Sequence, residues 1–266
     1  MSNICKLTGK TGKYVDSHLI PKALTRPEKR GRPFLEAGQG TRPIKRHSSW
    51  YDNHLVTDQG EKILSVIDDW AINKLREHRL VWSGWGPIVS LLDIEVIKGT
   101  DWAVRTRTDS EWPQLRLFFL SLLWRAAASS RKEFDDVELP HDDLERLREM
   151  VVNGDSGPIE FYPIQLMQLS TRGEIHNQTP FQDVKTIPAI DGVPEHQVPI
   201  IRFYFDGLIA HIDTRPEKEI EDANLGSLFL GFAEDLTITT VSYEASFQRE
   251  NMEAIKAEAD QFLDRR

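Results

Sequence analysis

The stretch from Leu115 to Ala128 is apolar on nearly every side, and it constrains the fold more than any other feature of the sequence. A helix without a polar face is stable in water only when other elements surround it. The spacing predicts a helix that starts near Ser110, with Pro113 in its first turn. Its longest apolar run, Leu117 to Trp124, is interrupted by Ser121 and is too short to cross a bilayer. We therefore expect a central buried helix in a globular chain.

The remainder of the sequence predicts an α+β fold. Apolar residues between Ile63 and Leu75 recur at three-and-four spacing, so we expect a helix with one apolar face and with Asp58 as its N-cap. The pair Asp206-Gly207 predicts a two-residue hairpin. The other expected elements are a helix over 141–152, strands at Ile159–Tyr162, Ile200–Phe205, Leu208–Ile212 and Leu236–Tyr243, a loop over 175–199, and a closing helix over 245–262.

Charge is distributed very unevenly along the chain. Residues 1–50 contain eleven Lys or Arg and three acidic residues, a net charge of +8, whereas the whole chain carries −9 and the remainder therefore −17. Such asymmetry is typical of a surface that binds a polyanion. Residues 19–46, rich in Pro and Gly, are expected to form a long basic loop with one helical turn near Lys22–Leu24; we call these residues the basic segment. The expected nucleic-acid contacts are Lys22, Arg26, Lys29, Arg30, Arg32, Arg42, Lys45 and Arg46. The alternative is a solvated basic loop that binds nothing.

Cysteine usage indicates the compartment. Cys5 is the only cysteine among 266 residues, so the chain has no internal disulfide, which fits a reducing cytosol. The N-terminus has no apolar signal region. We expect a cytoplasmic protein that does not enter a membrane.

A split stretch, Cys5 to Pro21 and then His47 to Glu61, resembles the core of the HNH (ββα-metal) nucleases. More narrowly, the Ser-His-Leu-Ile-Pro sequence that ends at Pro21 resembles the signature of bacterial HNH-like proteins. The resemblance implies an N-terminal ββα-metal module over residues 1–80. A mixed α+β domain over 81–266 would then follow, with central buried helices and a β-rich part closed by a helix.

The resemblance also implies a catalytic site. His18 would be the general base that activates a water molecule, and Glu61 would be a metal ligand at the start of a helix. Asp52 or Asn53 would orient His18 or complete the metal shell, with His54 as a neighbouring ligand. A carboxylate ligand suits Mg²⁺ or Mn²⁺, so the implied function is metal-dependent cleavage of DNA.

Glu61 has a second interpretation. It lies three residues after Asp58, and this spacing resembles a capping box in which the Glu side chain closes the first turn of the helix. One side chain cannot easily both cap a helix and bind a metal, and the sequence leaves the two roles open.

The sequence departs from the family pattern at its zinc-binding cysteines. Cys5 holds the first thiolate position, but Thr8, Thr57 and Gly60 occupy the other three. A structural zinc site needs four ligands, so we expect no structural zinc. The loss is compatible with a nuclease whose core replaces the zinc. It is equally compatible with an inactive nucleic-acid-binding or regulatory protein, or with a scaffold whose basic loop contacts a protein.

The buried helix carries a second family signature. Residues 118–125 read Phe-Phe-Leu-Ser-Leu-Leu-Trp-Arg and resemble the family's Leu-Ser-x-Leu-Trp-Arg helix. A buried guanidinium is costly without a partner. We therefore favour a structural ion pair for Arg125 over a contact with a phosphate group.

Overall fold

Residues Trp112–Ala128 form the helix α2, which is buried along almost its whole length. The structure is a computed structural model that describes residues 3–25, 34–38, 41–47, 49–189, 194–221 and 225–263. Pro113 lies in the first turn of α2, as its sequence predicts. Phe119 stacks on Phe205 of the large sheet, with ring centroids 6.1 Å apart. The prediction of a central buried helix is confirmed.

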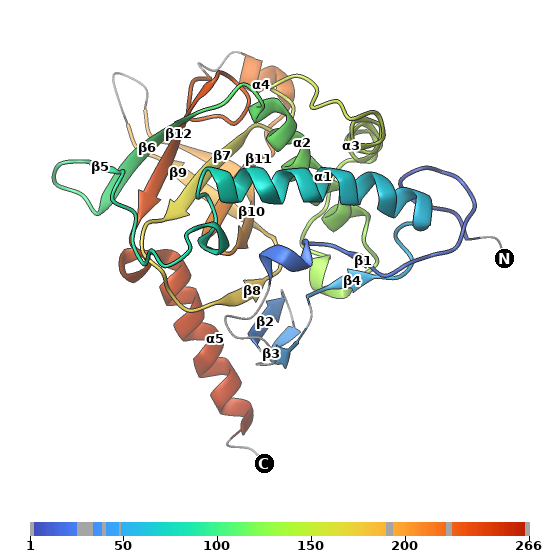
Figure 1. Cartoon of the computed structure of the whole chain (residues 1–266), viewed down its shortest axis with the longest axis horizontal. Helices are drawn as coiled ribbons and strands as arrows, with labels where there is room; N and C mark the ends of the chain where they lie inside the picture. The colour runs from blue at the N-terminus through green and yellow to red at the C-terminus, as the bar shows by residue number, and fades with distance from the viewer. Residues whose placement is uncertain are drawn as a thin grey trace.

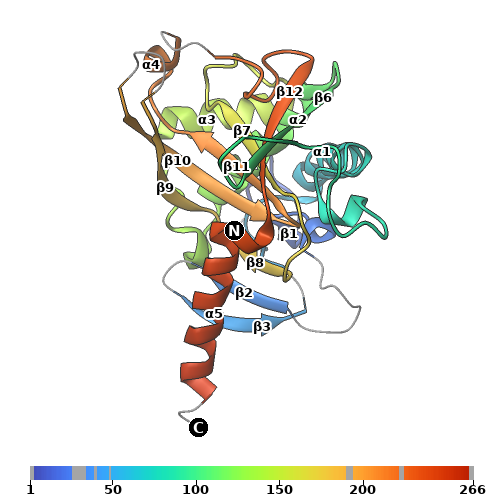
Figure 2. The same ribbon diagram turned by 90° about the vertical axis from the view of Figure 1, so that its left-hand side faces the viewer.

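A seven-stranded sheet forms the body of the molecule (Figure 2). Its strand order is β5-β6-β12-β7-β11-β10-β9, and all neighbours are antiparallel except β12 and β7. The strands are β5 (Glu95–Val96), β6 (Trp102–Thr108), β7 (Ile164–Leu169), β9 (Phe181–Ile187), β10 (His196–Phe205), β11 (Leu208–Asp213) and β12 (Asp235–Val241). Together with the helices, this sheet confirms the α+β class.

Each face of the sheet packs against a different layer. Side chains alternate along a strand, so Phe203 and Phe205 of β10 point to one face and Tyr204 to the other. The Phe residues join the core that contains α2 and α1 (Asp58–Glu77). Tyr204 joins a smaller core with Trp82 and Trp85 from the segment after α1.

The N-terminal part forms two small sheets below α1 (Figure 1). One sheet pairs β1 (Ser17–His18) with β4 (Tyr51–Asp52), antiparallel. The other has the order β3-β2-β8 and consists of β3 (Thr41–Arg46), β2 (Phe34–Gly38) and β8 (His176–Gln178). The prediction of one long loop over 19–46 is therefore wrong. Its described residues contain the two strands β2 and β3. The helical turn expected near Lys22–Leu24 is present as the 3-10 helix η1 (Lys22–Leu24).

Two further predictions for the C-terminal half are wrong. Residues 175–199, expected to be a loop, contain β8, β9 and the start of β10. Residues 159–162 are a turn, and the strand begins only at Ile164 because Pro163 precedes it. The hairpin at Asp206-Gly207 is confirmed, since Phe205 pairs with Leu208 across it.

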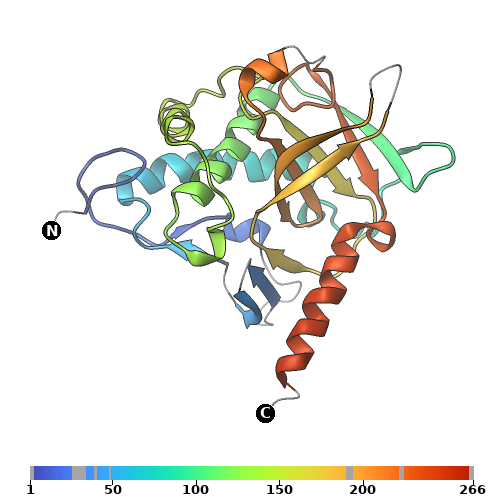
Figure 3. The ribbon, with the colours of Figure 1, turned by 180° about the vertical axis from the view of Figure 1, so that it is seen from behind.

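The remaining helices lie at the periphery. They are α3 (His141–Asn153), which packs on α2, the short α4 (Glu217–Glu221) and α5 (Phe247–Leu263). Helix α5 starts at the sheet and extends away from it past β3 (Figures 2 and 3). Among the described residues, no helix is long and apolar enough to span a membrane.

One hydrophobic core joins the two predicted segments. The cluster of buried side chains runs from Cys5 and Leu64 to Phe205 and Ile238, with α2 between them. Burial of this common core holds α1 and the N-terminal strands against the large sheet. The division at residue 80 stays a prediction.

Candidate metal and nucleic-acid site

The four positions aligned with the zinc ligands of the family that the sequence resembles, Cys5, Thr8, Thr57 and Gly60, lie together in the structure. The Thr8 backbone N–H donates to Cys5 Sγ at 3.4 Å. A Cβ atom on Gly60 would lie 2.7 Å from the same sulfur. Burial raises the pKa of the Cys5 thiol, but hydrogen bonds from Thr8 and Thr57 outweigh it and hold that pKa below its usual value. The Cys5 sulfur is therefore surrounded by polar contacts with Thr8 and Thr57. The absence of a structural zinc stays a prediction.

His18 lies on β1, is partly buried and pairs with Tyr51 of β4. Its backbone carbonyl accepts a hydrogen bond from Arg125 Nη1 at 3.3 Å, which ties β1 to α2. Its imidazole Nε2 is buried and has no hydrogen-bond partner among the described residues. Burial lowers the pKa of His18, and the ammonium of Lys22 lowers it further. The imidazole is therefore neutral near pH 7 and has a free nitrogen.

Glu61 lies in the first turn of α1, and its side chain does not cap the helix. The N-cap is Thr57, whose carbonyl accepts from the Glu61 N–H at 2.9 Å, so the prediction of Asp58 as N-cap is wrong. No side chain caps this helix end. Glu61 Oε2 is buried without a hydrogen-bond partner in the described part of the chain. The capping-box interpretation of Glu61 is wrong.

Electrostatics place Glu61 near His18. Among the carboxylates that raise the pKa of His18 against burial, Glu61 has the largest effect, followed by Asp16 and Asp68. Glu61 and Asp68 are seven residues apart on α1 and so lie on the same face of the helix. His18 thus lies over the face of α1 that carries Glu61. His18 Nε2 and Glu61 Oε2 both lack a hydrogen-bond partner among the described residues.

Asp52 does not join this pair. Ser17 pairs with Asp52 and His18 with Tyr51, so alternation places Asp52 on the opposite face from His18. The Asp52 carboxylate instead accepts hydrogen bonds from the Ser129 hydroxyl at 3.0 Å and from the Ser130 backbone N–H at 2.9 Å. The role predicted for Asp52 in orienting His18 is therefore not supported by the geometry. Its contacts are those of a structural residue that fastens β4 to the end of α2.

Asn53 and His54 lie in the exposed turn that follows β4. The His54 backbone N–H donates to Asp52 Oδ1 at 2.8 Å, and its ring meets Tyr14 edge to face, with centroids 5.5 Å apart. No contact joins either residue to His18 within the described ranges. Of the four other predicted site residues, only Glu61 acts on the pKa of His18, and the site itself stays a prediction.

The structure describes only some of the basic residues that are predicted to contact nucleic acid. Lys22, Lys45 and Arg46 are exposed to solvent, and Arg46 lies 3.8 Å from the buried carboxylate of Glu36. The side chain of Arg42 is not described. Arg26, Lys29, Arg30 and Arg32 lie outside the described residues.

The pair His18 and Glu61 can be tested for its fit to a metal ion. In the described part of the chain, no group of three or more His, Cys, Asp or Glu residues is arranged to hold a metal. A Mg²⁺ ion, however, commonly keeps several waters and binds proteins through only one or two carboxylates together with substrate phosphates. The Glu61 carboxylate oxygen, buried without a partner in the described part of the chain, fits that reduced set of oxygen ligands, and His18 Nε2 stays free to accept a proton.

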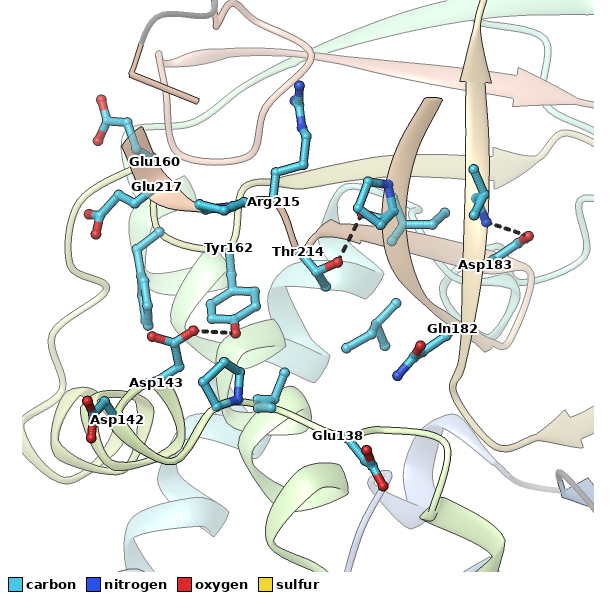
Figure 4. Close-up of a pocket in the computed structure, with 18 residues that line it drawn as sticks. Glu138, Asp142, Asp143, Glu160, Tyr162, Gln182, Asp183, Thr214, Arg215 and Glu217 are labelled. Atoms are coloured by element: carbon cyan, nitrogen blue, oxygen red, sulfur yellow. Dashed lines mark hydrogen bonds between the residues drawn. The ribbon is translucent and has the colours of Figure 1, made fainter. Parts of the chain in front are cut away.

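A cavity of about 710 Å³, which sequence reasoning missed, lies at the other end of the large sheet (Figure 4). The Tyr162 hydroxyl donates to Asp143 Oδ2 at 2.8 Å on its wall, and Arg215 is one basic residue of the lining. Its acidic lining residues are Glu138, Asp142, Asp143, Glu160, Asp183 and Glu217. These acids are scattered over 80 residues of sequence, so no local pattern predicts them. Their charge repels phosphate groups, and the cavity is therefore unsuited to nucleic acid.

Comparison of the chain with protein-family models, curated proteins and solved structures finds no match.

Proposed function

We propose that this protein is a divalent-metal-dependent nuclease that cleaves DNA at the site of His18 and Glu61. The observation that carries the proposal is that His18 Nε2 and Glu61 Oε2 are each buried without a hydrogen-bond partner among the described residues, while the Glu61 charge acts on the His18 imidazole. Native proteins seldom leave such atoms unsatisfied, and those that are unsatisfied often mark an unfilled ion or a catalytic role. The single cysteine fits a cytoplasmic location for this activity.

His18 is suited to the role of general base. Because burial holds its pKa below the usual value, the imidazole is unprotonated at neutral pH and can accept a proton from an attacking water. Glu61 would hold Mg²⁺ or Mn²⁺, which when bound polarises the phosphate and stabilises the leaving oxygen. The hydrogen bond from Arg125 to the His18 carbonyl fixes the backbone that carries the base.

A second candidate function is nucleic-acid binding without cleavage. It is favoured by the small ligand set: Asp52 is occupied by Ser129 and Ser130, and the described residues hold no group of three potential ligands. The basic N-terminal fifty residues would still contact phosphates in such a protein.

Plasmid nicking separates the two candidates. Supercoiled plasmid is incubated with the full chain and Mg²⁺ or Mn²⁺, with EDTA in a parallel reaction. The nuclease proposal expects open-circle product with metal and none with EDTA. Plasmid retardation on a native gel without any cleavage would instead support the binding candidate.

A further inference from the structure

A second cavity, of about 390 Å³, lies between η1, the C-terminal end of α1, the 3-10 helix η2 (Trp82–Gly84) and the β10–β11 turn. Its lining includes Arg76 of α1, Arg172 of the loop after β7, Trp82 and Asp206. Glu61 and Arg76 are fifteen residues apart on α1, so the cavity lies roughly 22 Å along the helix from the His18 site. It is therefore a separate location.

Arg76 is held in the cavity wall by neutral groups. Its Nε donates to Ser83 Oγ at 3.2 Å and its Nη2 to the Ala23 carbonyl at 3.5 Å. No carboxylate lies within ion-pair distance of its guanidinium among the described residues. Hydroxyl and carbonyl oxygens fix the direction of the guanidinium without cancelling its charge.

Arg172 is held in the same way. Its Nη2 donates to the backbone carbonyls of Trp82 at 3.0 Å and Gly86 at 2.8 Å. Its guanidinium carbon lies 5.9 Å from the centroid of the Trp85 ring. Within the described ranges it too forms no ion pair with a carboxylate. The cavity therefore has two positioned guanidinium groups, and both keep free N–H donors because each has five.

Asp206 is the opposing charge. Its Oδ2 accepts from the Ser83 backbone N–H at 3.1 Å, and neither arginine reaches it within ion-pair distance. Burial raises the pKa of Asp206 to about 6, while Ser83, Arg76 and Arg172 act to lower it. Trp82, which is 3% exposed, has an indole Nε1–H without an acceptor in the described part of the chain. Two cations, one carboxylate and an unused donor leave the cavity net positive.

We propose that this cavity binds a phosphoryl group, held by the guanidinium groups of Arg76 and Arg172. Guanidinium donors match phosphate oxygens in geometry and charge, which makes arginine the preferred residue for phosphate recognition. The ligand is either a backbone phosphate of a nucleic-acid strand or a free phosphorylated molecule. Ala23 and Leu24 of η1 line the cavity and follow the exposed Lys22, so a nucleic-acid strand bound near Lys22 could place a backbone phosphate there. The inference does not depend on cleavage at His18.

Inorganic phosphate and a short DNA duplex are the probes, each titrated into the ¹⁵N-labelled full chain by NMR. The indole N–H signal of Trp82, assigned with Trp82→Phe, reports occupancy of the cavity. We expect chemical-shift changes that saturate as the probe is added. The affinity derived from them should fall at least about tenfold in the double variant Arg76→Gln/Arg172→Gln. Arg249→Gln, which changes an exposed arginine of α5, is the matched control and should bind as the parent does.

Asp206→Asn gives a test of opposite sign that does not depend on the folding of the double variant. Asn can still accept from the Ser83 N–H, and loss of the carboxylate charge should tighten phosphate binding about threefold. If both inorganic phosphate and the DNA duplex shift the Trp82 signal, the ligand of the cavity is a backbone phosphate of a nucleic-acid strand. If inorganic phosphate alone shifts it, the ligand is a free phosphorylated molecule. The inference is overturned if neither probe moves the Trp82 signal, or if Asp206→Asn weakens binding. His18→Ala should bind phosphate normally, so failure of the nuclease proposal remains distinguishable.

Discussion

Arg125 of α2 and Asp68 of α1 form a two-point ion pair, with Nη1–Oδ2 and Nη2–Oδ1 separations of 3.0 and 2.5 Å. The Arg125 side chain is 1% exposed, so the pair lies in the helix interface. The same guanidinium donates to the His18 carbonyl. One buried charge therefore joins both helices to the strand that carries the proposed base, and the predicted ion pair of Arg125 is confirmed.

Replacing Asp68 tests the energetic role of this pair. Asp68→Ala leaves a buried guanidinium without its counter-charge, so we expect the free energy of unfolding to fall by about 3 kcal/mol. Urea denaturation measures the change. The control is Glu253→Ala, which breaks the exposed pair with Arg249 and should cost less than about 1 kcal/mol. Equal losses in the two variants would contradict a structural role for the buried pair.

Gly60 tests the packing around the Cys5 sulfur. A Cβ on Gly60 would meet Cys5 Sγ at 2.7 Å and Val56 Cβ at 2.9 Å. Gly60→Ala gains about 1 kcal/mol in helix propensity but adds an overpacked methyl group that costs about 1–3 kcal/mol. We expect a net loss of stability in thermal or urea unfolding, with Lys62→Ala on the exposed face of α1 as the control. A more stable Gly60→Ala variant would show that the surroundings of the Cys5 sulfur are loosely packed.

Glu36 should make stability depend on pH. Burial raises the pKa of this β2 carboxyl to about 7, because Arg46 at 3.8 Å compensates only in part. The unfolded chain releases this proton near pH 4.5 while the folded chain keeps it, so stability should fall as pH rises from about 4.5 to 7. The loss amounts to about 3 kcal/mol above pH 7. Glu36→Gln should remove it.

Urea midpoints at pH 5 and pH 8 measure this effect. The parent should lose more stability than Glu36→Gln between the two values, since Gln cannot ionise. Identical pH dependence in the two proteins would show that the folded pKa of Glu36 is not raised.

Salt dependence tests nucleic-acid binding by the basic segment. Each phosphate that the segment neutralises should contribute about −0.9 to the slope of log affinity against log salt for a DNA duplex. Reversal of Lys29, Arg30 and Arg32 to Glu should weaken binding to all sequences and flatten the slope. Fluorescence anisotropy at several salt concentrations provides the measurement. Binding unchanged by the triple reversal would identify the segment as a solvated surface.

The parts of the fold that the sequence predicts are those governed by local pattern. The all-round apolar character of α2, the one-sided periodicity of α1 and the Asp206-Gly207 hairpin each depend on neighbouring residues. The strand β2 was missed because it pairs in parallel with β8, and Glu36 pairs there with Asn177, far away in sequence. Helix boundaries depend on final backbone geometry, which selected Thr57 and not Asp58 as N-cap.

In the candidate site, too, only the residues that belong to local sequence motifs were predictable. His18 and Glu61 follow from the resemblance of local motifs, and the charge of Glu61 raises the pKa of His18 against burial. The structural role of Asp52 comes from its hydrogen bonds with Ser129 and Ser130, which are distant in sequence and which no local pattern connects to it. The cavity of Arg76 and Arg172 was missed for the same reason, since its walls come from five separate segments of the chain.

The most direct test of the nuclease proposal is the rate of metal-dependent plasmid cleavage by parent, His18→Ala and Glu61→Gln. Loss of the general base in His18→Ala should slow cleavage by about 10²- to 10⁴-fold. Glu61→Gln should also slow cleavage, because it weakens binding of the metal ion. Because Glu61 does not cap α1, both variants should melt at the temperature of the parent. Slowed cleavage with unchanged melting is the predicted result. Cleavage by His18→Ala at the parental rate, or no metal-dependent cleavage by the parent, would contradict the proposal.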